Sequence, residues 1–247
     1  GVELQGARGN TIGGVAMDGD RNAAANVIGG HLRDGIHIVD GLGTETGRNI
    51  VQGNFIGVSG NGTPLPNQRD GIRLETARDS RIGGTDANQG NVIAANGGRG
   101  VHVLFGFGTD PRRNAILGNS IYDNGHLGID LAGGTEDAAG VTANDPLDAD
   151  GGSVAPNDLQ NAPHLESAER DPQAATVRIT GQLPSEPGAT YRIEYFASAQ
   201  ADPSGSGEGQ RLIGSETVTT AGDGNAALSF QSTVTVGPQD DITGIGI

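Results

Sequence analysis

Cysteine is absent from the 247-residue chain, which excludes disulfide bonds and metal sites built on thiolates. Tryptophan and lysine are absent too, and aromatic residues make up only 3% of the sequence, so no platform for stacking sugars is evident. No apolar run approaches the roughly 18 residues that a membrane-spanning helix needs. We therefore expect no membrane span.

Basic charge is scarce as well. Fifteen arginines stand against 30 acidic residues, which gives a net charge of −15. An acidic surface repels phosphate backbones, and the closest approach to a basic stripe is the pair Arg112 and Arg113. We expect no nucleic-acid partner, and the charge favours divalent cations, cationic surfaces or neutral glycans instead.

Glycine is abundant, with 44 residues, but no Gly-X-Y period runs through the sequence, so a collagen helix is excluded. The aliphatic residues form short β-branched clusters separated by Gly, Asn and Asp. This composition predicts an ordered, turn-rich all-β protein.

An internal repeat organises the first half of the chain. A four-residue phrase, Gly-[Ile/Val]-x-aliphatic, occurs five times, and we call these segments side A. They are residues 1–4, 35–38, 71–74, 100–103 and 128–131.

Two further aliphatic positions recur between successive copies of the phrase. The side B positions are Ile12, Val51, Ile82 and Ile116, and the side C positions are Ile28, Ile56, Ile93 and Ile121. An asparagine stands two places before most of them, at Asn10, Asn26, Asn49, Asn54, Asn91, Asn114 and Asn119.

Three aliphatic positions per repeat, separated by corners of variable length, predict a solenoid whose coil contains three short strands. Alternation within a strand directs Ile36 and Ile38 inward and His37 outward. Glycine and asparagine tolerate the left-handed backbone that corners require, and stacked asparagine side chains can hydrogen-bond along the axis.

Three phrases carry a resemblance to known proteins: residues 10–14 (NTIGG), 53–57 (GNFIG) and 90–93 (GNVI). They resemble the repeats of right-handed parallel β-helix proteins of the pectate-lyase-like superfamily, which includes large bacterial surface and secreted proteins as well as pectate lyases and polygalacturonases. The resemblance covers about residues 1–131 and implies the fold and a secreted or cell-surface location. It says little about activity, because the matching residues are structural.

The segment 132–165 is acidic and rich in turns, and we interpret it as a connector that caps the last coil. Within it, alternating carboxylates followed by two glycines suggest a calcium loop formed by Asp145, Asp148 and Asp150 and completed by Asp158. The loop lacks the downstream glutamate of an EF-hand, and a solvated cap rich in Asx turns is the alternative. Calcium is the one cofactor suggested, and the fold does not require it.

From residue 166 onward, alternating apolar and polar residues predict a small β-sandwich of immunoglobulin-like type. The expected strands are residues 176–180, 191–196, 211–214, 227–230 and 233–236, with a last one at 242–247. The last of these strands has no closing partner in the sequence, and the first side A segment, residues 1–4, begins directly on a full coil with no polar cap before it. Head-to-tail assembly or strand addition between copies is one interpretation, and a piece of a longer chain is the other.

An alternative function lies on the outward positions of side A. Glu3, His37, Arg73, His102 and Asp130 are expected to stack one coil apart. In β-helix lyases and hydrolases the catalytic groups sit on an exposed sheet face, so His37, Arg73, His102 and Asp130 are the candidate catalytic residues if the chain is an enzyme. The paired aspartates and Gly-His-Gly of polygalacturonases are missing. Glu3 and Asp130, four coils apart, are also too distant for paired glycosidase carboxylates.

The sequence thus predicts a right-handed, three-sided parallel β-helix at residues 1–131, a connector at 132–165 and an immunoglobulin-like β-sandwich at 166–247. We expect an extracellular structural or adhesive protein without catalytic activity that assembles with its own copies or binds a cell-surface glycan. A polysaccharide lyase or glycoside hydrolase acting on side A is the alternative.

Overall fold

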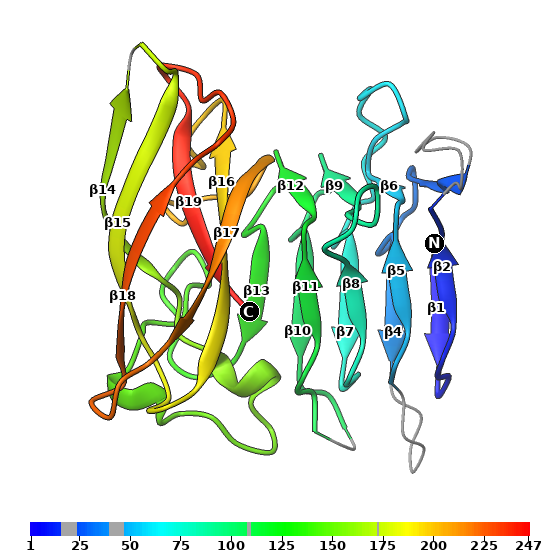
Figure 1. Cartoon of the computed structure of the whole chain (residues 1–247). Helices are drawn as coiled ribbons and strands as arrows, with labels where there is room; N and C mark the ends of the chain where they lie inside the picture. The colour runs from blue at the N-terminus through cyan, green and yellow to red at the C-terminus, as the bar shows by residue number, and fades with distance from the viewer. Residues whose placement is uncertain (16–23, 40–46, 108–109, 172) are drawn as a thin grey trace.

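The computed structural model describes residues 1–15, 24–39, 47–107, 110–171 and 173–247. The protein is all-β, with three parallel sheets followed along the chain by two antiparallel sheets. Figure 1 shows the parallel strands arranged side by side in one half of the molecule and the long antiparallel strands in the other. No helix among the described residues is long and apolar enough to cross a membrane.

The side A segments form the first parallel sheet. Its strands, in spatial order, are β1 (Val2–Gln5), β4 (Ile36–Val39), β7 (Ile72–Glu75), β10 (Val101–Leu104) and β13 (Ile129–Ala132). The register aligns Ile36 with Ile72, Ile72 with Val101 and Val101 with Ile129. The predicted aliphatic column is therefore confirmed.

Sides B and C form the other two parallel sheets. Side B contains β2 (Thr11–Gly13), β5 (Ile50–Gln52), β8 (Arg81–Gly83) and β11 (Ala115–Leu117). Side C contains β3 (Val27–Ile28), β6 (Phe55–Ile56), β9 (Val92–Ala94) and β12 (Ser120–Tyr122). Both predicted aliphatic rows pair in register. Each turn of the chain, which we call a coil, adds one strand to each sheet, an arrangement compatible with the expected three-sided parallel β-helix.

Alternation within each strand places aliphatic side chains between the three sheets. Ile36 and Ile38 are fully buried, whereas His37 between them is partly exposed. Inward residues of all three sides form one hydrophobic cluster. Burying an isoleucine or leucine contributes about 1.5–3 kcal/mol, so the repeated column is the main stabilising feature of this half.

Asparagine side chains link one coil to the next at the corners. Oδ1 of Asn91 accepts hydrogen bonds from the backbone and the side-chain amide of Asn54, both at 3.0 Å. Asn91 in turn donates to Oδ1 of Asn119 at 2.9 Å. We call such a series a ladder, and Asn10 and Asn49 begin another one. Stacked corner asparagines, predicted from the sequence, are thus present.

A third ladder was not predicted. Asn67 donates to Asn96 at 2.8 Å, and Asn96 donates to Asn124 at 3.0 Å. Each of these asparagines lies four residues before a side A glycine, so an Asn-x-x-x-Gly-[Ile/Val] pattern could have revealed it. The corner glycines are equally constrained: Gly83 has φ +85°, and a Cβ there would lie 2.0 Å from the carbonyl oxygen of Leu117.

The second half of the chain contains two three-stranded antiparallel sheets. One has the order β14 (His164–Asp171), β15 (Thr176–Pro184) and β18 (Asn225–Gln231), and the other β17 (Arg211–Thr219), β16 (Thr190–Ser198) and β19 (Asp241–Gly246). Residues of both sheets share one hydrophobic core. Between β13 and β14 lie two short 3-10 turns, η1 (Pro146–Asp148) and η2 (Pro156–Leu159).

Two strand assignments differ from the sequence prediction. Residues 233–236 form no strand. Of these residues only Val236 reaches the core, and Val234 is 39% exposed. The hydroxyl of Ser232 accepts a hydrogen bond from the backbone N–H of Val177. The alternation there reflects one buried position in an irregular segment. Conversely, β14 was not predicted, because this edge strand is mostly polar.

Strand β16 is buried on both faces, whereas a strand in a surface sheet has one face exposed to solvent. Ile193 and Tyr195 point into the core between the antiparallel sheets. Glu194 and Phe196, 1% exposed each, point the other way. The sheet β17-β16-β19 therefore packs on the last coil of the parallel half, as Figure 1 shows.

Candidate functional site

The outward residues of side A stack as the sequence predicts. The register pairs Glu3 with His37, His37 with Arg73, Arg73 with His102, and His102 with Asp130. The four candidate catalytic residues therefore form a continuous row across neighbouring coils.

Glu75 connects the first part of this row. It lies at the end of β7, and its Oε2 is 3.2 Å from Nε2 of His37 and 3.2 Å from Nε of Arg73. All three side chains are about one quarter exposed. Arg73 and His37 are thus engaged with a shared carboxylate.

The second part of the row is a buried polar cluster around His102. Nδ1 of His102 lies 2.8 Å from Oδ2 of Asp70, and its Nε2 lies 3.9 Å from Oδ2 of Asp130. Nε of Arg99 donates to the same oxygen of Asp130. His102, Asp70 and Asp130 are only 6%, 5% and 2% exposed.

The two aspartates respond differently to this burial. Burial by itself raises the pKa of Asp70, but the hydrogen bonds from His102 and from the backbone N–H of Arg99 outweigh it and lower the pKa below the ordinary value. Burial raises the pKa of Asp130, against the opposing hydrogen bond from Arg99. Asp70 is the ionised partner, so Nδ1 of His102 carries the proton between them.

Among the described residues, Nε2 of His102 is a buried polar atom without a hydrogen-bond partner. When Nδ1 of His102 carries the proton, Nε2 can only accept a hydrogen bond. The carboxyl group of Asp130, which Nε2 faces, can donate one only in its protonated form. The cluster thus has the groups of an acid and base pair, with a carboxylate on each side of one imidazole ring. Its burial leaves little surface on which a polysaccharide can lie.

Sequence reasoning missed Asp70, Glu75 and Arg99, which hold this row together. Asp70 and Arg99 stand immediately before side A glycines, and Glu75 follows the phrase by one place. Asp34 occupies the same corner one coil earlier, and its carboxylate accepts the N–H of Asp70 at 3.2 Å. The dipeptide Asp-Gly before the phrase, present twice, was the available signal.

The predicted calcium loop is partly assembled. Asp145, Asp148 and Asp150 offer carboxylate oxygens that all lie within 4.8 Å of one another. Asp158, the fourth predicted ligand, instead accepts a hydrogen bond from Arg112 at 3.0 Å. The structure therefore brings together three of the four residues.

The three carboxylates differ in their hydrogen bonds. Asp148 accepts from the hydroxyl of Ser185 at 2.6 Å and from the N–H of Asn161 at 3.0 Å. Burial raises the pKa of Asp148, and the charges of Asp150 and Asp145 add to this. Burial and then Asp145 raise the pKa of Asp150. Mutual repulsion of this kind is relieved by a cation, and oxygen ligands of this type suit Ca²⁺.

A third feature is the contact between the last coil and the segments that follow it in the chain. At each corner of this coil, a side chain from a later segment accepts a hydrogen bond. Asn157 accepts from the backbone N–H of Asn114 at 3.0 Å, and Glu194 accepts from the N–H of Gly118 at 2.7 Å. At the third corner, Glu208 accepts from Asn124. The side C strand is covered too, because Ile121 donates to the carbonyl of Gly209 at 2.8 Å.

With this geometry in view, the chain was compared with known proteins. Neither the protein-family models nor the curated proteins give a match. The function therefore has to be argued from the residues themselves.

Proposed function

We propose that the chain is a right-handed, three-sided parallel β-helix capped by an immunoglobulin-like β-sandwich, and that it serves as a secreted structural or adhesive module without catalytic activity. Parallel strands joined by crossover connections are almost always right-handed, which supports the handedness. Two antiparallel sheets around one core support the sandwich.

The observation that carries this proposal is how completely the polar groups are used within the fold. Asparagines bond from coil to coil. At the corners of the last coil, Asn157 of the connector and Glu194 and Glu208 of the antiparallel half accept hydrogen bonds. On side A, where an enzyme of this kind would act, His102 and Asp130 are buried. Such an arrangement favours rigidity and length over an accessible reaction centre.

Partners follow from the charge. A surface with net charge −15 favours neutral glycans or cationic surfaces over acidic polymers. Self-assembly is the other route to a structural role. Because the cap covers the last coil, assembly at that end would proceed through the edge strands β14 or β17 rather than through coil-on-coil stacking.

The experiment combines a glycan array with product analysis. Labelled protein is applied to immobilised neutral and acidic polysaccharides with and without Ca²⁺, and the soluble fraction is assayed for reducing or unsaturated ends. We expect retention on neutral glycans, or oligomers by negative-stain imaging, with no released product. Released product, or a monomer that binds no surface, would overturn the proposal.

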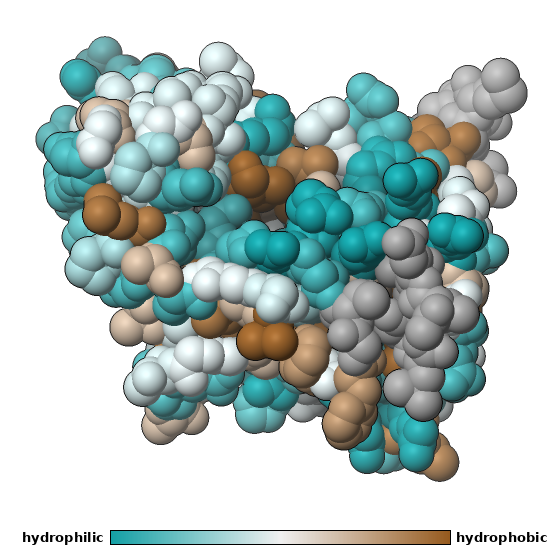
Figure 2. Space-filling view, turned by 90° about the horizontal axis from the view of Figure 1, so that it is seen from below, coloured by the Kyte–Doolittle hydropathy of each residue, from teal (hydrophilic) through white to brown (hydrophobic). Residues whose placement is uncertain are grey.

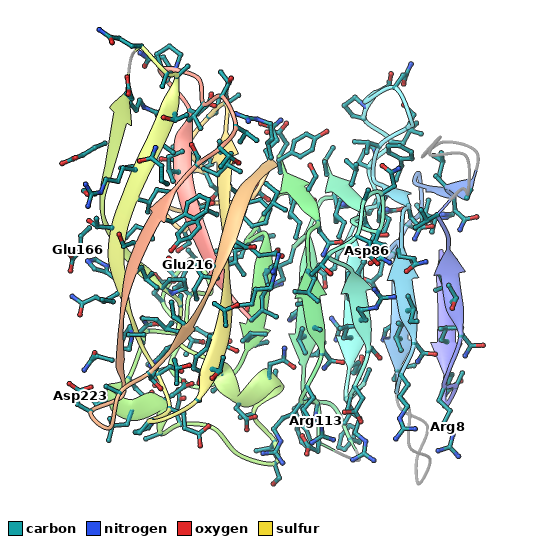
Figure 3. The ribbon with its side chains drawn as sticks, in the orientation of Figure 1. Arg8, Asp86, Arg113, Glu166, Glu216 and Asp223 are labelled. Atoms are coloured by element: carbon teal, nitrogen blue, oxygen red, sulfur yellow. The ribbon has the colours of Figure 1, made fainter. Side chains whose placement is uncertain are left out.

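A second candidate function is supported by the pair Asp70 and Asp130 on either side of His102. An inverting glycoside hydrolase needs two carboxylates separated by roughly 6.5–9.5 Å, and a lyase needs a base near a positive charge. This hypothesis predicts that any glycan cleavage is lost in Asp130→Asn and Arg73→Ala. It should persist in Glu166→Gln, whose carboxylate lies at the outer edge of β14 (Figure 3).

Calcium is a further part of the proposal. Asp145, Asp148 and Asp150 would supply carboxylate oxygens, and backbone carbonyls of the same loop the remaining ligands. Because Asp148 also bonds Ser185, which follows β15 in the antiparallel half, an ion here would strengthen the connection between the connector and the β-sandwich.

A further inference from the structure

A cleft of about 800 Å³ lies between the last coil and the antiparallel half. One wall contains Ile116, Ile129 and Leu131 of the last coil, and the other contains Ile245 and Ile247 at the end of the chain. Figure 2, seen from below, shows a notch between the two halves with apolar residues at its foot.

The cleft exists because the cap covers the corners of the last coil more closely than its centre. In the inner coils, the aliphatic core residues are fully buried by the coils on either side, as Ile72 and Val101 are. In the last coil, Ile129 and Leu131 are only partly buried. The corners are fixed by hydrogen bonds to Glu194 and Glu208.

The outer face of the sheet β17-β16-β19 supplies the opposite wall. Ile242 packs in the core between the antiparallel sheets, whereas Ile245 pairs with Glu194, whose side chain points to the last coil. Thr243, on the same face as Ile245, donates to the carbonyl of Glu208 at 2.9 Å. The cleft is therefore bounded by aliphatic side chains on two sides and by polar groups at its rim.

The size and lining of the cleft suit a small molecule. Small-molecule sites have volumes of roughly 300–1,000 Å³ and mainly apolar walls. An aliphatic ligand held between Ile129, Leu131 and Ile245 would remove apolar surface from water, which is favourable.

The charges around the cleft select the ligand. Arg113, a lining residue, is held by Asp79 at 2.7 Å, and Asp130 is paired with Arg99. Among the described residues, no positively charged side chain pairs with Asp241, and Glu208 accepts hydrogen bonds from the neutral Asn124. The charge of Asp241 is therefore uncompensated, which disfavours a carboxylate ligand and favours a cation.

We propose that this cleft binds a single small aliphatic molecule that carries a positively charged group. The aliphatic part lies between the last coil and β19, and the charged group faces Asp241 and Glu208. This site is independent of the structural role, and it shares strand β13, including Asp130, with side A.

Isothermal titration with three probes of equal chain length tests the site: octylammonium, octanol and octanoate, each below its micelle concentration. We expect octylammonium to bind at least tenfold more tightly than octanoate, with octanol between them. Asp241→Asn should reduce this preference by about threefold to tenfold while leaving octanol binding unchanged.

A cleft-filling variant locates the site. Ile245→Trp should abolish binding of octylammonium without lowering the thermal midpoint, whereas Leu32→Trp, at a position 76% exposed, should bind like the parent. Equal binding by Ile245→Trp, equal affinity for octylammonium and octanoate, or no binding of any probe would each overturn the proposal.

Discussion

Glu208 ends the third asparagine ladder by accepting two hydrogen bonds from Asn124, at 3.3 Å from the backbone N–H and 3.0 Å from the side-chain amide. An asparagine in this position would accept the same bonds and pass an N–H to a further coil. A carboxyl group, ionised or protonated, has no N–H to pass on. The residue that stops the ladder is thus chemically suited to stopping it.

This contact makes stability depend on pH. Burial raises the pKa of Glu208 to about 7 from its ordinary value of 4.5, with smaller effects from Asn124 and Asp202. The folded state therefore holds the proton more tightly than the unfolded chain does. The stabilisation that the protonated Glu208 gives the folded state is complete below about pH 4.5. It is lost as the pH rises to about 7, a change on the order of 3 kcal/mol in the free energy of unfolding.

Urea unfolding of the parent and of Glu208→Gln between pH 4 and pH 8 measures this dependence. The difference in free energy of unfolding between the two proteins should change by that amount across the range. Glu166→Gln, an exposed position, should follow the parent at every pH. Parallel curves for parent and Glu208→Gln would show that the carboxylate does not titrate in this window.

Replacing an interior ladder residue should be costly. Asn91→Ala removes the acceptor of two bonds from Asn54 and the donor to the carbonyl of Val51. Because each buried group left without a partner costs about 1–3 kcal/mol, we expect a loss of at least 2 kcal/mol in the free energy of unfolding. Thr85→Ala, in an exposed turn of the same coil, should change it by less than about 0.5 kcal/mol.

The two histidines of side A should behave differently if their role is structural. His102→Ala leaves Asp70 and Asp130 buried without their common partner and should cost about 3 kcal/mol. His37→Ala breaks a partly exposed pair with Glu75 and should cost less than about 1 kcal/mol. Equal costs, measured by urea unfolding at pH 7, would contradict the importance of the buried cluster.

Calcium should stabilise the protein through the acidic loop. Millimolar Ca²⁺ is expected to raise the thermal midpoint by about 5 °C, because an ion that binds only the folded state shifts the unfolding equilibrium. Asp150→Asn should remove the effect without disturbing the Ser185 bond, which belongs to Asp148. Glu166→Gln should retain it, and an equal rise in Asp150→Asn would place the ion elsewhere.

Much of the parallel half could be predicted from the sequence because its constraint is local and repeated. A single aliphatic side chain such as Ile72 says little, but the same phrase recurring once per coil defines both the strand and the row to which it belongs. The asparagine of each corner precedes its strand by a fixed number of residues, so Asn54 and Asn91 could be paired without coordinates.

The remainder depends on contacts between distant segments, for which no such period exists. Glu194 and Glu208 lie more than 70 residues beyond the corners that they cover, and nothing in their surroundings marks them as caps. Asp70 was overlooked because alternation assigns the outward position to Arg73, whereas the corner residue also reaches the same face. At Val236, one buried residue in an alternating segment imitated a strand.

The connector and the β-sandwich contact the last coil at its corners, through Asn157, Glu194 and Glu208. Every coil has nearly the same corners. A duplicated copy of the coil that begins at Gly100 would end in equivalents of Asn114, Gly118 and Asn124, and would offer the cap the same three attachment points. Length in this architecture is therefore separable from termination: whole turns can be inserted or deleted during evolution while the terminal piece continues to fit unchanged.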